Sequence, residues 1–233
     1  MRLSITALPV LLASVAFPQV IVSKPSIRAF GEGVVSIRPD QVRVSVSVTT
    51  RGNTAEESAS ENATKVTAVL AALRTLLGPN ADIRTTSYSV TPLYRYAPNV
   101  EPVLTGYSTT NTIEVTSADL SVAGKVIDTA TQAGATTIAG LRFGLRDAEP
   151  SRIQALRMAT QQARAHAEAI AQGLNVRLGG VISADEGFSV RSLPTVDSRT
   201  ATGAGAGSAP TPVESGMIEV HATVTLELEI AGQ

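Results

Sequence analysis

Few side chains in this sequence combine a reactive type with a spacing that chemistry needs. The 233 residues include two histidines, no cysteine and no tryptophan. Without cysteine there is no thiol catalysis, disulfide, iron–sulfur cluster or cysteine-ligated zinc, and two histidines exclude a three-histidine zinc site. We therefore predict no catalytic residue, no metal ligand and no cofactor-binding residue, and we expect the protein to use no cofactor.

The pair Glu219 and His221 is the first exception to consider. The two residues are two apart in a segment that alternates polar and apolar residues, so both side chains lie on one face of the expected strand. Such a pair could supply two metal ligands or an acid–base couple. The other histidine, His166, lies in an expected helix, and no third ligand is in view. We interpret Glu219 and His221 as part of a solvated strand face.

Two further motifs are incomplete. Gly31 and Gly33 precede a strand, and Ser36 stands where a dinucleotide fingerprint has its third glycine. We interpret these glycines as a bulge or a close crossing of strands. The sequence contains no Gly-x-Ser-x-Gly nucleophile elbow, although its many serines leave a hydrolase open as an alternative.

The tyrosines form the most informative cluster. All four fall within residues 82–116, in an expected hairpin, in a chain with only four phenylalanines besides. Tyrosine combines rigid apolar area with a hydroxyl group, which enriches it at interfaces. Tyr88 and Tyr94 have the same strand parity and can share a face; burial of the rings in the core is the alternative. We predict a self-association or partner surface here, made by Tyr88, Tyr94, Tyr96 and Tyr107.

The N-terminus predicts export. Met1-Arg2 is followed by an uncharged, mostly apolar run, and small residues precede a potential cleavage point after Ala16. We predict a signal peptide at residues 1–16, extending at most to residue 23, and a periplasmic protein. An uncleaved anchor is the alternative, because residues 3–22 carry no charge. The net charge of -1 and the lack of a polybasic segment argue against nucleic-acid binding.

Hydrophobic periodicity divides the remainder into strands and helices. Val42, Val44, Val46 and Val48 alternate with polar residues, as a half-buried strand does. Thr54 and Glu57 have capping-box spacing, which predicts that a helix begins there. Gly78 and Pro79 predict its end. In full, we predict strands near 27–37, 41–49, 82–95, 105–116, 136–145, 181–190 and 217–230, and helices near 54–77, 118–133 and 150–173. We expect Ser117 to cap the second helix. The periodicity places Ala59 and Ala63 on the buried face of the first helix, and it places Ile153, Leu156 and Ile170 on that of the third.

These elements predict an α+β fold, with a mixed, largely antiparallel sheet and three helices packed on one face. The domain should comprise residues 25–192 plus 214–231. Residues 194–215 are rich in Gly, Ala, Thr and Pro, and we predict that they form a disordered loop within the domain.

Several segments resemble the SIMPL domain family, which occurs in bacterial periplasmic and outer-membrane-associated proteins. The resemblance covers residues 27–190 and the last strand, and it leaves out residues 194–215. The matching segments are Gly31-Glu32-Gly33 through Pro39-Asp40-Gln41, Asp82 to Tyr88, Gly106-Tyr107 with Asn111, Ala133-Gly134-Ala135 with Gly140 to Phe143, and the alanine-rich helix ending at Gly173 followed by Leu178-Gly179.

The resemblance implies an exported α+β domain without established catalytic residues, linked to envelope and oxidative-stress phenotypes and, in some members, to large oligomers. We therefore expect a non-enzymatic envelope protein that acts as a homo-oligomer or through an unidentified envelope protein. Membrane contact would come only from an uncleaved N-terminal segment. A periplasmic small-ligand-binding module, or a hydrolase, using a groove between sheet and helices is the alternative function.

Overall fold

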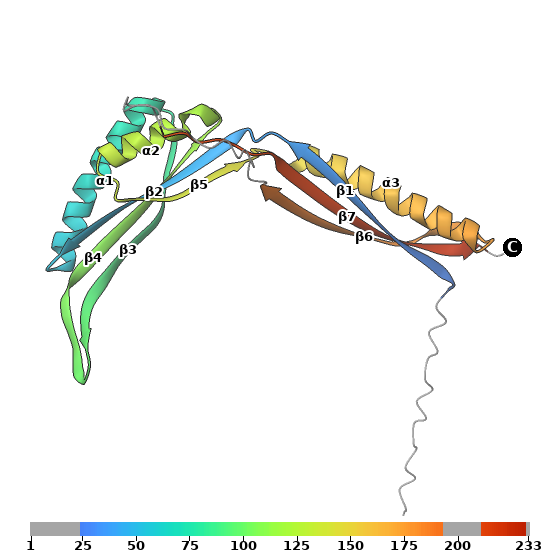
Figure 1. The fold of residues 1–233 in the computed structure, drawn as a ribbon, viewed down its shortest axis with the longest axis horizontal. Coiled ribbons are helices and arrows are strands. Elements are labelled where there is room, and N and C mark those ends of the chain that lie inside the picture. The colour runs from blue at the N-terminus through green and yellow to red at the C-terminus, as the bar shows by residue number, and fades with distance from the viewer. Residues whose placement is uncertain (1–23, 193–210, 232–233) are drawn as a thin grey trace, which may run out of the picture.

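The computed structural model describes residues 24–192 and 211–231 (Figure 1). The predicted leader and residues 194–210 of the predicted loop lie outside the described residues. None of the described helices is both long and apolar enough to cross a membrane. The elements, in chain order, are β1 (Ser26–Ile37), β2 (Gln41–Gly52), α1 (Ala55–Leu77), β3 (Asp82–Ala97), β4 (Val100–Ser117), the 3-10 turn η1 (Leu120–Val122), α2 (Ala123–Gln132), β5 (Thr137–Gly144), α3 (Glu149–Gly173), β6 (Arg177–Ser192) and β7 (Ile218–Ala231).

The α+β class is confirmed, but the strands form two sheets and not one. One sheet has the order β1-β7-β6 and the other β3-β4-β2-β5, and every strand pair is antiparallel. The helices divide accordingly: α3 packs on the first sheet, and α1 and α2 pack on the second (Figure 1). The prediction of three helices on one face was wrong. Alternation of polar and apolar residues identifies the apolar face of a strand, but it does not show which strand pairs with it or which helix covers it.

Small residues allow α3 to approach its sheet closely. Alternate residues of β1 and β7 face the helix, which buries an alanine every four residues. A Cβ atom at Gly31 would overlap the Ala159 carbonyl, and one at Gly33 the Ala155 carbonyl. The two glycines therefore mark a close approach of backbones, as one predicted interpretation had it, but the element that crosses the strand is a helix and not another strand. The buried alanines are Ala155, Ala159, Ala163, Ala167 and Ala171.

The close approach also corrects the predicted buried face of α3. The sequence pattern placed Ile153, Leu156 and Ile170 inward, but Ile153 and Ile170 are exposed. Large side chains do not fit between a helix and a strand whose backbones nearly touch, so they lie on the flanks of α3.

The second sheet carries the predicted valine row of β2. These four valines face α1 and α2 together with Ile113 and Val115 of β4. Helix α1 begins as predicted at Thr54, whose hydroxyl accepts a hydrogen bond from the Glu57 amide at 3.1 Å. The Glu57 carboxylate in turn accepts from the Asn53 amide at 2.9 Å, so the capping box closes one residue earlier than in its usual form.

The second predicted helix begins later than expected. Ser117 was predicted as its cap, but Asp119 caps the short 3-10 turn that precedes α2. The hydroxyl and the backbone amide of Ser121 both donate hydrogen bonds to the Asp119 carboxylate, and they lower the pKa of that group below its ordinary value.

Candidate interaction surface

The β3–β4 hairpin extends well past the helices that cover its base (Figure 1). Its strands pair from Asp82 opposite Thr116 to Ala97 opposite Val100, with three irregularities in register. The base of the hairpin is covered by α1, whereas its distal part has no helix against it. Side chains near the tip are consequently open to solvent or to a partner.

The predicted tyrosines lie on this exposed part. Tyr88, Tyr94 and Tyr96 are 55%, 47% and 76% exposed, and Tyr107 is half-buried. The rings of Tyr94 and Tyr96 lie 6.5 Å apart between centroids, in a tilted arrangement. Further apolar side chains exposed on the hairpin are Val90, Val100, Val103 and Leu104.

The register brings several of these residues to one face. Tyr94 lies opposite Leu104, and Tyr107 lies opposite Pro92. Tyr88 and Tyr94 are six residues apart in β3, and the extra residue of the intervening bulge belongs to β4, so both point to the same side. Together these side chains form a contiguous apolar and aromatic face.

The two histidines occupy separate places. His221 lies 3.0 Å from the Glu219 carboxylate on the face of β7 turned away from α3, as the strand pattern predicted. His166 is hydrogen-bonded through Nδ1 to the Phe30 carbonyl at 2.8 Å. Within residues 24–192 and 211–231, no three His, Asp or Glu side chains are grouped as metal ligands would be, and neither histidine bonds to a serine hydroxyl.

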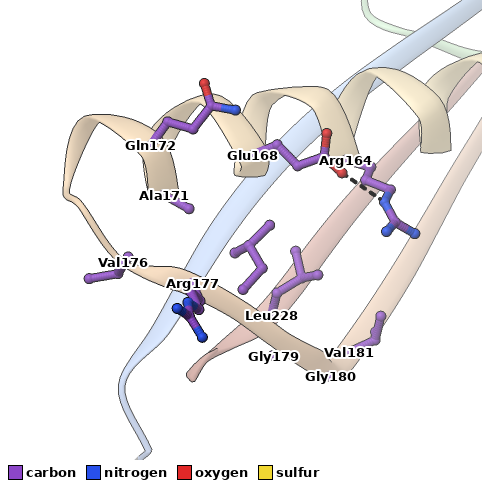
Figure 2. Close-up of a pocket in the computed structure, with 11 residues that line it drawn as sticks. Arg164, Glu168, Ala171, Gln172, Val176, Arg177, Gly179, Gly180, Val181 and Leu228 are labelled. Carbon is purple, nitrogen blue, oxygen red and sulfur yellow. Dashed lines mark hydrogen bonds and ion pairs between the residues drawn. The ribbon is translucent and has the colours of Figure 1, made fainter. Parts of the chain in front are cut away.

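A pocket of about 450 Å³ lies between the C-terminal half of α3 and the start of β6 (Figure 2). Its walls combine apolar side chains, among them Leu228, with the ion pair of Arg164 and Glu168, which are 3.0 Å apart. Figure 2 shows Arg177 at the opposite end of the pocket from Arg164. The sequence pattern missed this site because it placed the start of the strand at Val181, after Gly179 and Gly180.

Comparison with known proteins places the chain in a family. The family model described as SIMPL, protein of unknown function (DUF541), matches residues 27–228. The 26 kDa periplasmic immunogenic proteins of Brucella melitensis and Brucella abortus are each 29% identical over 162 residues. That match covers 67% of this chain and 64% of each relative, slightly less than two thirds of their length.

A third relative is the uncharacterized protein YggE of Edwardsiella ictaluri. It is 32% identical over 102 residues, which cover 44% of this chain and 43% of that protein. The family model spans both sheets, from β1 to β7, so the whole described fold lies within the match. The chain belongs to the SIMPL family.

Proposed function

We propose that this protein is an exported, periplasmic SIMPL-domain protein without enzymatic activity that acts through self-assembly or binding of an envelope protein. Two relatives are named as periplasmic proteins, and the N-terminal sequence has the pattern of a signal peptide. A role in envelope or oxidative-stress defence is part of the proposal and rests on the family resemblance.

The observation that carries the proposal is the exposure of the hairpin tyrosines. A contiguous apolar and aromatic surface that stays exposed on a folded protein is typical of an interaction site. Burying it in an interface would contribute about 25 cal/mol for each Å² of apolar surface removed from water. The tyrosine hydroxyls can remain hydrogen-bonded at the rim of such an interface.

Sedimentation velocity on residues 17–233 tests the proposal. We expect the protein to sediment as an oligomer, or as a complex when envelope extract is added, and Tyr88→Ala with Tyr94→Ala to shift it to the monomer. Tyr88→Phe with Tyr94→Phe should retain most of the association, because the apolar area is kept.

The matched control removes exposed apolar area from the other sheet. Phe30→Ala with Val34→Ala truncates two exposed side chains of β1 and should leave the sedimentation profile unchanged. A double tyrosine variant that sediments like the parent protein would contradict the proposal.

Binding of a ligand between sheet and helix is the second candidate function. The specific observation that favours it is the pocket between α3 and β6, whose volume falls in the range of about 300–1,000 Å³ that ligand sites occupy.

A further inference from the structure

The two edge strands of the sheet under α3 differ in how their main-chain atoms are hydrogen-bonded. At the β1 edge, α3 reaches over the strand: His166 bonds to the Phe30 carbonyl, and the Glu32 amide donates to the Gln162 side chain. At the β6 edge, none of the described side chains makes a hydrogen bond to a main-chain atom of β6. A long strand with unoccupied amides and carbonyls is a template for pairing with another strand.

A row of apolar side chains lies beside this open edge. Val181, Phe188 and Val190 of β6 stand opposite the buried residues Leu228, Ala222 and Val220 of β7, so they point to the α3 side of the sheet. They are nevertheless 61%, 43% and 46% exposed. The buried core beneath helix α3 is built with residues of β1 and β7, and these β6 side chains lie outside it.

We use the name β6 groove for the strip of surface between this apolar row and the flank of α3. Arg152 crosses it, pairing with Glu186 and lying over the Phe188 ring at 5.1 Å from its centroid. Further along the helix, a shallow apolar hollow of about 400 Å³ is lined by α3 residues alone, among them Ile153 and Leu156, and it shares Arg164 with the larger pocket. The surface beside β6 therefore combines exposed apolar side chains with the ion pair of Arg152 and Glu186.

The pocket closes the groove at the start of β6. The register slips between Leu178 and Val181, so Gly179 and Gly180 together face a single residue, Glu229. A Cβ atom at Gly180 would meet nothing within 4 Å, so the missing side chain leaves space. Arg177 takes part in no ion pair among the described residues, whereas Arg164 is paired with Glu168. The pocket rim thus carries one uncompensated positive charge.

From these features we propose that β6 binds the extended C-terminal segment of a partner polypeptide. The segment adds to the β6 edge as an antiparallel strand, in keeping with every other pair in the molecule. Alternate apolar side chains of the segment enter the groove beside Phe188 and Val190, and its terminal carboxylate lies in the pocket near Arg177. Main-chain pairing gives such complexes their affinity, and side-chain pockets give them their specificity.

Charge decides between this occupant and a second copy of the chain. An antiparallel strand that adds to β6 ends at the start of β6, where Arg177 needs an anion, and a chain terminus supplies one. An antiparallel β6 from a second copy would instead bring the end of its strand, with Arg191 and Ser192, beside Arg177, which adds a positive charge and supplies no anion.

Fluorescence polarisation against a peptide library tests the inference. The probes are ten-residue peptides with apolar residues at alternate positions, any residue between them, an N-terminal fluorophore and a free C-terminal carboxylate. We expect a subset to bind residues 17–233, and the amidated forms of the same peptides to bind at least tenfold more weakly. Arg177→Gln should reduce binding by a similar factor, with Arg51→Gln as the matched control on the other sheet.

A filled pocket gives the sharpest test. Gly180→Phe should abolish binding while circular dichroism and the Tm stay close to those of the parent, because the added side chain enters open space. If Gly180→Phe proves unstable, Phe188→Ala takes its place as the test. It removes an apolar side chain from the β6 groove, leaves the register slip at Gly179 and Gly180 unchanged, and should weaken peptide binding.

The inference would be overturned if no peptide binds, or if amidated peptides bind equally well. It would also be overturned if Gly180→Phe, or Phe188→Ala in its place, binds peptides like the parent protein. Finally, if Phe188→Glu converts an oligomer of the protein to a monomer, the β6 edge belongs to a second copy and not to a peptide. The tyrosine surface plays no part in this experiment, so its outcome is independent of the proposed assembly.

Discussion

Two glycines and a row of alanines set how closely α3 approaches its sheet. Gly31 and Gly33 face the backbone of α3 directly, and no other residue leaves room for the Ala159 and Ala155 carbonyls. The sequence pattern singled out both glycines and excluded a dinucleotide site. It could not show which element crosses them, because that element lies more than a hundred residues away in the chain.

Gly31→Ala should therefore destabilise the protein. The added methyl group would force α3 away from β1, and overpacking of this kind lowers the free energy of unfolding by about 1–3 kcal/mol. Gly144→Ala is the matched control, since a Cβ atom there meets nothing within 4 Å. Urea unfolding followed by circular dichroism measures both, and equal midpoints for the two variants would contradict the packing described.

In helix α1, the face that the sequence pattern marks as apolar differs from the face that the tertiary structure buries. The pattern placed Ala59 and Ala63 of α1 inward with the larger apolar residues. The structure buries Ser58 and Asn62 instead, together with Val66, Val69 and Leu73. The Asn62 amide donates to the Val48 and Thr109 carbonyls at 2.9 and 3.2 Å, which a pattern of apolar residues does not reveal.

The start of α1 is an element whose stability is set locally. Thr54→Ala removes the hydroxyl that accepts from the Glu57 amide and should lower the free energy of unfolding by about 0.5–2 kcal/mol. Thr54→Ser, which keeps an acceptor at the same position, should restore most of that loss. Thermal or urea unfolding distinguishes the variants, and an alanine variant as stable as the parent would show that the cap is dispensable.

At the scale of the whole molecule, residues 211–217 connect the two sheets. Thr211 is held on α2: its amide and hydroxyl donate to the Asp128 carboxylate at 3.1 and 2.6 Å. Val213 packs against the core of the second sheet, and β7 of the first sheet begins at Ile218. Residues 211–217 thus run from α2, on the second sheet, to β7 of the first.

Acid should loosen this connection. The hydrogen bonds from Thr211 lower the pKa of Asp128 below its ordinary value, so the folded state favours the carboxylate. Their contribution is complete above about pH 4, the ordinary range of an aspartate, and is lost as the pH falls through the lowered pKa. Hydrogen exchange of residues 211–217, corrected for the intrinsic effect of pH, should therefore rise in that range.

Asp128→Ala should produce the same increase in exchange at neutral pH. The control is Asp119→Ala, because the pKa of Asp119 is also lowered by hydrogen bonds, but those bonds come from Ser121 and not from Thr211. Unchanged exchange of residues 211–217 in the Asp128 variant would show that other contacts hold the connection.

The sequence by itself determined the elements, the apolar faces of β2 and β7, the cap of α1 and the membership of the family. These features depend on residues close together in the chain, where the periods of strand and helix are visible. The tertiary structure decided that the strands form two sheets, that α3 turns its alanines and not its own large residues toward the sheet, and that the hairpin tyrosines and the β6 groove remain exposed. The physical reason is that strand pairing and helix docking join segments far apart in the chain, and exposure depends on what is left uncovered once those contacts form.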